Sequence, residues 1–369
     1  MDVGSKSSER LNARSKAGSA KALLGGRLLR RLVLPALLLA LPLAFLLAVD
    51  LDGLFELGDG LTSPGSGDIL GSAQAGPDWA DLFNADGTLK DGNSNGTPDA
   101  EEGNGVTAIF IADPLSAKGL TDITHFASSN KNSDPISTWN WDGGNEPPKD
   151  DLSNVYAYAA INSIGDLIIY AGLERLAPEG DSHIDFEFNQ SEVGLDKTPP
   201  CAGDGVPDPN DAKPCEFVGA KTNNDLLITM DFENGGDLGF VRAFRWDDPN
   251  SAYVEVESLP GEGCTFDDFI CGFNNGGDID GGPWPNYERG GATITNLPMN
   301  AFSEIGVNVT ELFGLTPCFA SIQAHTRTSQ SVTSELKDFA VGSFSICNLS
   351  VDKTGPSISK IGDEVTYPY

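Results

Sequence analysis

Three segments of the chain follow the two-residue period of a β-strand. In HIDFEF, residues 183–188, the apolar side chains share one face and the polar side chains share the other. The pattern recurs in residues 226–232 and, after an Asn-Gly-Gly turn, in residues 240–246. Because successive side chains of a strand point to opposite sides, this pattern predicts strands with one buried face and one face in water.

The stretch from Val155 to Gln190 contains three apolar runs separated by Gly and Pro residues. This succession predicts a β meander, in which each strand pairs with the next one along the chain. Residues 106–112 predict an earlier strand, and no long helical periodicity follows. We therefore predict an all-β fold, an antiparallel β-sandwich of the jelly-roll or lectin-like kind.

Composition agrees with a chain of strands and loops. The 369 residues include 43 Gly and 23 Pro but only 3 Met, which is typical of strands joined by loops rather than of a helical bundle. The formal net charge of −31 makes nucleic acid a poor partner. So acidic a surface attracts divalent cations, although a protein adapted to high salt would show the same charge.

The first 49 residues have the organisation of an export element. Residues 1–31 carry eight Lys and Arg residues, and residues 32–49 carry no charge. A cationic stretch before an apolar run predicts either a cleavable signal peptide or a retained signal anchor. We expect an extracellular or cell-surface protein that contacts the membrane only through residues 32–49, if they are not removed.

All six cysteines lie in the second half of the chain, and no CxxC pattern is present. An even number of cysteines after an export signal predicts disulfides. Of the fifteen possible connectivities we favour nearest neighbours in sequence, Cys201–Cys215, Cys264–Cys271 and Cys318–Cys347, because each pair brackets a turn-rich loop or a hairpin-length segment.

Residues 50–105 form a stretch rich in Gly, Asp and Asn, which we interpret as an extended arm with few core residues. Within it, DGNSNGTPDAEE at residues 91–102 matches the spacing of a single calcium-binding loop. Alternate oxygen-bearing side chains, a Gly at the turn and a closing Glu suit a hard cation. The predicted calcium ligands are Asp91, Asn93, Asn95, Thr97, Asp99 and Glu102. A solvated acidic loop would explain the same residues.

Large aromatic residues offer two interpretations. Trp139 and Trp141 are two residues apart, so on a strand they would share a face. With Trp284 they could form a platform on which sugars stack, or they could belong to the sandwich core, which is the usual place of large aromatics.

The last 21 residues, LSVDKTGPSISKIGDEVTYPY, resemble the opening of an Ig-like conserved repeat of prokaryotic surface proteins, a domain of unknown function. The matching residues are Lys353, Thr354, Lys360, Gly362, Asp363, Val365, Thr366 and Tyr367. Residues 55–348 are similar to the amino-terminal module that precedes such repeats in bacterial secreted proteins, through FELGDG, GPDWADLF and DLLITMDFENGG. The resemblance implies a surface or extracellular role and brings no catalytic residues.

These observations divide the chain into an export element at 1–49, an acidic arm at 50–105, a sandwich domain at 106–349 and the truncated start of an Ig-like repeat at 350–369. We expect a non-enzymatic structural or adhesive module whose partners are cell-surface glycans or other surface proteins. The alternatives are a carbohydrate-binding sandwich and, with less support, a glycoside hydrolase. The chain lacks the GxSxG, HExxH and phosphate-loop motifs, and its three histidines are dispersed.

Overall fold

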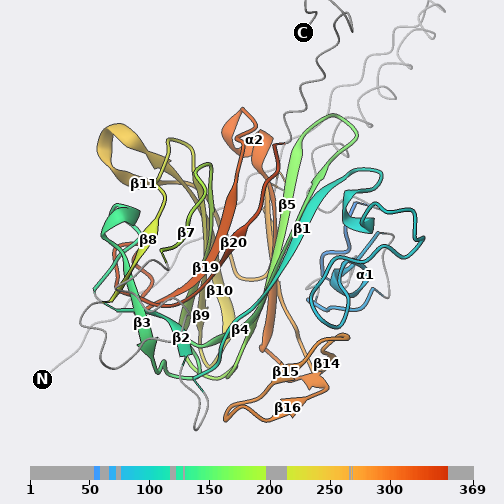
Figure 1. The fold of residues 1–369 in the computed structure, drawn as a ribbon, viewed down its shortest axis with the longest axis horizontal. Coiled ribbons are helices and arrows are strands. Elements are labelled where there is room, and N and C mark those ends of the chain that lie inside the picture. The colour runs from blue at the N-terminus through green and yellow to red at the C-terminus, as the bar shows by residue number, and fades with distance from the viewer. Residues whose placement is uncertain are drawn as a thin grey trace, which may run out of the picture. The chain divides into compact units, whose positions relative to one another are not determined.

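The computed structural model describes residues 54–58, 66–71, 76–116, 122–127, 129–196, 214–265, 267 and 269–347. These residues form an all-β sandwich with a few short helices (Figure 1). Every strand pairing that the structure describes is antiparallel. The predicted export element and the predicted Ig-like repeat lie outside the described residues. Within the described ranges, no helix is long and apolar enough to span a membrane.

One layer is a six-stranded sheet. Its strands, in spatial order, are β1 (Gly105–Ala112), β4 (Leu152–Ile161), β5 (Leu167–Arg175), β18 (Phe302–Asn308), β13 (Ile270–Asn274) and β12 (Gly263–Cys264). The central strands β4 and β5 are buried almost along their whole length, as expected of strands covered on both faces.

The other layer is a ten-stranded sheet. Its strands, in spatial order, are β11 (Ala252–Pro260), β10 (Asp237–Asp247), β9 (Leu226–Glu233), β6 (Ser182–Asn189), β19 (Ser321–Arg327), β20 (Leu336–Ser343), β2 (Asp122–Phe126), β3 (Asn140–Gly144), β8 (Cys215–Val218) and β7 (Gly194–Leu195). In Figure 1 this sheet extends from β3 and β8 on the left to β19 and β20 near the centre, with β4, β5 and β1 on its right.

Short elements complete the described fold. Two small ribbons pair β14 (Ile279–Asp280) with β17 (Asn296–Leu297) and β15 (Asn286–Tyr287) with β16 (Thr293–Ile294). The helices are α1 (Trp79–Leu82) and α2 (Val309–Phe313), and the 3-10 turns are η1 (Asp99–Glu101), η2 (Ile136–Thr138) and η3 (Asp248–Asn250).

The main core lies between the two sheets, as the alternating pattern predicts. Ile184, Phe186 and Phe188 of β6 and the residues of β9 at positions 226, 228, 230 and 232 belong to one buried cluster with apolar residues of β4 and β5. Each of these side chains contributes about 1.5 to 3 kcal/mol by leaving water. The predicted apolar faces of β6 and β9 are therefore confirmed.

The predicted meander is correct for two of its three strands. β4 and β5 pair as a hairpin in the six-stranded sheet. β6, by contrast, pairs with β9 and β19 in the ten-stranded sheet, so the chain crosses from one layer to the other after β5. The connection between β5 and β6 packs closely against the turn between β9 and β10. A Cβ added at Gly236 in that turn would lie 2.0 Å from the carbonyl oxygen of Pro178 in the connection. Period-two alternation indicates which side of a strand is buried, but it does not indicate to which sheet the strand belongs. The sequence therefore did not show that β6 lies in a different sheet from β4 and β5.

The described parts of residues 50–105 pack on the outer face of the six-stranded sheet, so the interpretation as an extended arm is wrong for them. Phe55 and Trp79 are fully buried, with ring centroids 4.6 Å apart, and Phe55 stacks on Tyr170 of β5. Glu304 of β18 fastens this segment, because it accepts hydrogen bonds from the Gly58 amide at 2.8 Å and from Trp79 Nε1 at 2.9 Å. A few scattered apolar residues are therefore enough to hold this segment in place, because the outer face of the sheet supplies the other residues of their buried cluster.

Two predicted disulfides are present. Cys264 and Cys271 lie directly opposite each other on β12 and β13, and Cys318 is bonded to Cys347 beyond the end of β20. Cys215 is also disulfide-bonded, and its predicted partner Cys201 lies outside the described residues. Each bridge is expected to contribute about 2 to 4 kcal/mol.

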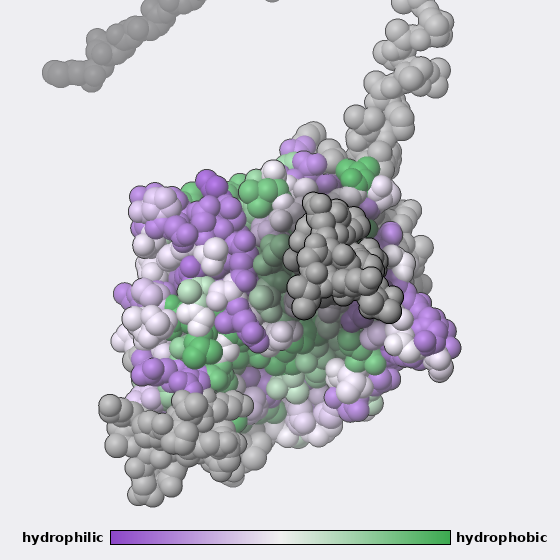
Figure 2. Space-filling model, turned by 45° about the horizontal axis from the view of Figure 1, so that its top comes forward, coloured by the Kyte–Doolittle hydropathy of each residue, from purple (hydrophilic) through white to green (hydrophobic). Residues whose placement is uncertain are grey.

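The surface mixes hydrophilic and hydrophobic residues. On the face drawn in Figure 2, hydrophilic residues occupy much of the margins, and hydrophobic residues gather nearer the middle. The large apolar residues that the structure exposes are Leu70, Ile164, Val218, Val254, Met299 and Leu315. They come from separate loops and edges, and isolated apolar residues of this kind are normal on a soluble surface.

Candidate functional site

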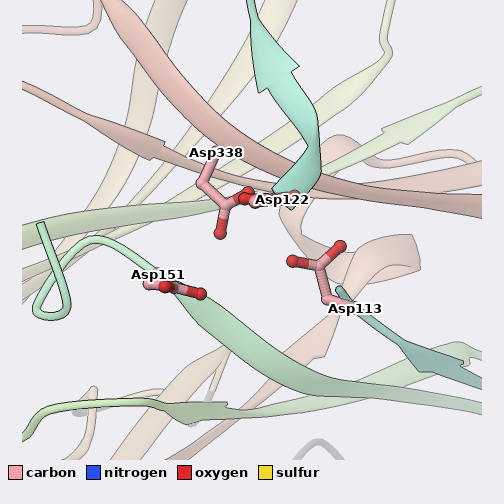
Figure 3. A group of neighbouring side chains, drawn as sticks. All are labelled: Asp113, Asp122, Asp151 and Asp338. Atoms are coloured by element: carbon pink, nitrogen blue, oxygen red, sulfur yellow. The ribbon is translucent and has the colours of Figure 1, made fainter. Parts of the chain in front are cut away.

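Four aspartates meet between the two sheets and are called here the aspartate cluster: Asp113, Asp122, Asp151 and Asp338. Each offers a carboxylate oxygen, and these oxygens all lie within 4.8 Å of one another. In Figure 3 the four carboxylates converge on one space from separate elements of the fold. Oxygen atoms at this spacing could coordinate a single cation.

The two sheets contribute equally to the aspartate cluster. Asp113 directly follows β1 and Asp151 directly precedes β4, so both lie at the same end of this antiparallel pair in the six-stranded sheet. Asp122 opens β2 and Asp338 lies within β20, two neighbours in the ten-stranded sheet. Asp338 also touches the opposite layer, since its Oδ2 accepts a 2.7 Å hydrogen bond from the Leu152 amide of β4.

Other hydrogen bonds orient the carboxylates and leave oxygens free. Asp122 Oδ1 accepts from the amide and hydroxyl of Thr124, and Asp151 Oδ2 accepts from the Ser116 amide at 3.0 Å. The second oxygen of each carboxylate, Asp122 Oδ2 and Asp151 Oδ1, has no hydrogen-bond partner in the described structure, and neither has Asp113 Oδ2. Because buried polar atoms nearly always have a partner, three such atoms in one place require an explanation.

Burial and like charge act together on the aspartate cluster. Burial, with Asp122 nearby, raises the pKa of Asp151 to about 8. Burial and the other three carboxylates hold the pKa of Asp338 well above its usual range. Burial, with a smaller effect of the Asp122 carboxylate, also holds the pKa of Asp113 well above its usual range. Burial also raises the pKa of Asp122, although its hydrogen bonds to Thr124, together with Asp338 and the nearby His125, lower it. The cluster therefore either holds protons or requires an external positive charge.

A second set of buried carboxylates lies on the ten-stranded sheet, on the face turned away from the main core. The set, called here the charged row, comprises Asp185, Glu187 and Asp231 with their partners His183, Lys221, Arg242, His325 and Arg327. Arg327 Nε lies 2.8 Å from the Asp185 carboxylate, and its Nη2 lies 3.2 Å from Asp231 Oδ1. One guanidinium thus serves two strands.

The charged row corrects the prediction that this face of β6 is wet. Asp185 and Glu187 are fully buried, because Trp139 and Phe126 cover the His325 ring at centroid distances of 6.3 and 6.2 Å. Burial alone would raise the pKa of Asp185, but Arg327 and His325 more than offset it and hold the pKa below its usual range. Lys221 and His325 lower the pKa of Glu187 in the same way, against the effect of burial.

The three histidines are dispersed in the sequence, yet each lies beside a carboxylate. His183 Nδ1 is 2.8 Å from Asp231 Oδ1, and His325 Nε2 is 3.2 Å from Asp185 Oδ2. His125 Nδ1 contacts Glu146. His183 lies on the face of β6 that was predicted to be in water, yet its neighbour across the strand, Asp231, supplies a carboxylate partner.

The predicted calcium loop folds back on itself. Asp91 accepts hydrogen bonds from the Asn95 and Gly96 amides, while the side-chain amides of Asn93 and Asn95 donate to Glu102. The structure thus brings four of the six predicted ligands together, and Gly96 adopts the positive φ of 90° that the motif needs. Thr97 also joins this group, since its backbone N–H donates to Asn95 Oδ1 at 2.8 Å, whereas Asp99 accepts from the Gly92 amide. Calcium at this exposed loop stays a prediction.

The candidate sugar platform is buried. Trp139 and Trp141 are 0% and 1% exposed and belong to the apolar cluster around β3 and β8. Trp284 is 4% exposed, and its Nε1 donates to Glu174 at 3.0 Å. These three rings lie against protein, so they provide no exposed face on which a sugar could stack.

A small cleft lies near the charged row. It has a volume of about 290 Å³, and its lining includes Trp246, Lys221, Ile136 and Ser133. The Lys221 ammonium is 4.7 Å from the Trp139 ring and 5.5 Å from the Trp246 ring, so the cation is already held by aromatic faces. Trp246 itself is only 6% exposed, which leaves little ring area for a ligand.

The aspartate cluster was missed by sequence reasoning. Its members are up to 225 positions apart, and a chain with 54 Asp and Glu residues provides many similar candidates. One local signal exists, because Asp113 and Asp151 border two strongly apolar strands directly. An acid at the end of a buried strand is held near the core, but only the fold shows which acids meet.

No protein-family model, curated protein or solved structure matches the chain. The resemblance to an Ig-like repeat at residues 349–369 falls outside the described residues and stays a prediction. The similarity of residues 55–348 to the amino-terminal module of bacterial secreted proteins also stays a prediction.

Proposed function

We propose that the chain is a non-enzymatic module that acts outside the cytoplasm as a structural or adhesive part of a bacterial surface protein. The observation that carries this proposal is the state of its interior acids and bases. The carboxylates and histidines of the charged row bond to one another beneath a cover of aromatic residues. A general acid or base has to reach its substrate, and buried groups in mutual ion pairs do not.

Three further properties support an extracellular role. The disulfides that the structure describes are stable in an oxidising environment, where such bridges form. The net charge of −31 favours solubility and repels nucleic acid. The apolar run at residues 32–49, after a cationic stretch, is typical of an export element. We infer that the sandwich is of the jelly-roll or lectin-like kind, with its larger sheet carrying the second, charged face.

Location can be tested with the full chain in a bacterial host. We expect a reporter enzyme that is active only outside the cytoplasm to gain activity when fused after Tyr369. The same fusion should lose activity when residues 32–49 are replaced by a polar sequence of equal length. Retention of the unaltered fusion in the cytoplasm would contradict the proposal.

Activity and ligand binding can be tested together. The purified protein is incubated with a panel of polysaccharides, and both hydrolysis and binding are measured. We expect no hydrolysis. Turnover that disappears in Asp185→Asn or Glu187→Gln would replace the proposal with a glycoside hydrolase, and binding that disappears in Trp246→Ala would replace it with a carbohydrate-binding sandwich.

A further inference from the structure

We propose that the aspartate cluster binds one calcium ion, which joins the two sheets of the sandwich. This site is distinct from the loop predicted at residues 91–102. It does not depend on the proposed function, since it rests only on the geometry of four buried side chains.

The position of the cluster explains what an ion would do there. Asp113 and Asp151 come from the six-stranded sheet, and Asp122 and Asp338 come from the ten-stranded sheet. Four buried carboxylates within coordination distance repel one another across this junction. A cation among them would convert the repulsion into attraction and hold the two layers together.

The local charges favour such a partner. None of the four aspartates forms an ion pair with Lys, Arg or His in the part of the chain that the structure describes. Three of their oxygens have no hydrogen-bond partner there, although the side chains are at least nine-tenths buried. Buried charges are normally paired or coordinate a metal. Because the chain supplies no paired cation among the described residues, we infer that the solution supplies it.

The hydrogen bonds around the cluster are those expected of supporting groups in a metal site. Each of Asp122, Asp151 and Asp338 has at least one oxygen fixed by a backbone amide. These bonds orient the carboxylates, which leaves the free oxygens of Asp122 and Asp151 available to a ligand. The side chains are therefore positioned before an ion arrives.

The donor set selects the type of ion. All four donors are carboxylate oxygens, with no Cys and no His among them, so a hard cation is favoured over zinc or copper. Magnesium keeps several of its waters and demands regular octahedral geometry, whereas calcium accepts six to eight oxygens in irregular arrangements. Deep burial leaves little room for a hydrated ion.

The test uses the full oxidised chain, freed of metals with a chelator, and measures thermal unfolding with and without CaCl₂. At a calcium concentration 100 times the dissociation constant, we expect the midpoint to rise by about 4 °C. The matched variants are Asp151→Asn in the cluster and Glu102→Gln in the loop. We expect the calcium-dependent shift to be lost in Asp151→Asn and retained in Glu102→Gln.

Each outcome decides between the sites. A shift that persists in Asp151→Asn but is lost in Glu102→Gln would overturn the proposal in favour of the loop. The absence of any shift with calcium would also overturn it and leave a cluster that shares protons. A larger shift with magnesium than with calcium would overturn the choice of ion.

A second variant covers the case in which Asp151→Asn does not fold. Asp113→Asn removes a different donor of the cluster, contributed by the residue that follows β1. Isothermal titration of the folded variant should give at least a tenfold weaker calcium affinity than the unaltered protein. Equal affinity in the two proteins would exclude the cluster as the binding site.

Discussion

The aspartate cluster and the charged row are two groups of buried carboxylates with opposite electrostatic states. In the charged row, Arg327, His325 and Lys221 neutralise the carboxylates, and the pKa values of Asp185 and Glu187 are lowered. In the aspartate cluster the neighbours are other carboxylates, and the pKa of Asp151 is raised to about 8. Burial is similar in both places. The difference teaches that the identity of the neighbours, rather than depth, decides whether a buried acid is ionised.

The two groups also connect different parts of the fold. The charged row joins β6, β9 and β19, which are already adjacent strands of one sheet. The aspartate cluster lies where two sheets meet, at positions that backbone hydrogen bonds of a single sheet do not unite. Ion pairs supplied by the chain therefore reinforce a sheet, whereas the proposed calcium ion would reinforce the contact between sheets.

The largest expected effect comes from breaking the charged row at Arg327. Arg327→Met removes the guanidinium shared by Asp185 and Asp231 and leaves two buried carboxylates short of charge. We expect the free energy of unfolding to fall by about 3 to 5 kcal/mol, measured by urea denaturation. Lys337→Met, which breaks an exposed pair with Glu335, is the control and should cost less than about 1 kcal/mol. Equal losses in the two variants would remove the distinction between the row and the surface.

A neutral substitution in the aspartate cluster should have the opposite sign in the absence of calcium. Asp151→Asn keeps an oxygen to accept the Ser116 amide and replaces a carboxyl group that the folded state must protonate or hold beside three other carboxyl groups. At neutral pH and without metal, we expect a gain of about 1 kcal/mol in the free energy of unfolding. Asp231→Asn in the charged row should be destabilising under the same conditions. If both variants are destabilising by similar amounts, the cluster is not strained by its own charge.

The pH dependence of the metal-free protein should reflect the aspartate cluster between about pH 4 and pH 8. The folded pKa of Asp151, about 8, exceeds its ordinary value of 3.8, so the folded state binds more protons across this range. The free energy of unfolding therefore falls as pH rises, by at least about 1 kcal/mol between pH 5 and pH 8. Calcium should flatten this slope, as denaturation at each pH would show.

The charged row should respond at the other end of the pH scale. The folded pKa values of Asp185 and Glu187 lie below their ordinary values. The two carboxylates therefore contribute fully to the free energy of unfolding at pH values above their ordinary pKa values. This contribution is lost as the pH falls through the folded pKa values. Loss of stability on acidification that is unchanged in Asp185→Asn would contradict this assignment.

A smaller loss of stability than that of Arg327→Met is expected at the rim of the charged row. Arg242 pairs with Asp231 at 2.5 Å, but the Arg242 side chain is 19% exposed. When Arg242 is replaced, Asp231 still has Arg327 and His183 as partners. We expect Arg242→Met to cost about 1 kcal/mol in urea denaturation. A loss as large as that of Arg327→Met would show that the stabilisation from each ion pair of the charged row does not increase with the burial of that pair.

Much of the fold follows from local pattern, and the candidate site does not. Strands at residues 105–112, 152–161 and 226–233 are evident because their apolar runs and alternation are local properties of the chain. The crossing of β6 to the second sheet depends on which strands pair at long range, which alternation does not encode. The burial of Asp185 and Glu187 depends equally on partners far away in sequence, such as Arg327 and Lys221.

Metal ligands show the same limit. The loop at residues 91–102 is detectable because its donors lie close together in sequence. The aspartate cluster takes one residue from each of four separate strand regions, so no spacing rule identifies it. Two predicted disulfides were recoverable because their cysteines are neighbours in the cysteine order and lie 7 and 29 positions apart.

The most direct test of the account is a crystal structure of the calcium-loaded protein with anomalous diffraction recorded for the bound ion. We predict an anomalous peak in contact with Asp113, Asp122, Asp151 and Asp338, and no peak in the charged row. A structure in which the four carboxylates contact only one another, with calcium absent or bound solely at residues 91–102, would contradict it.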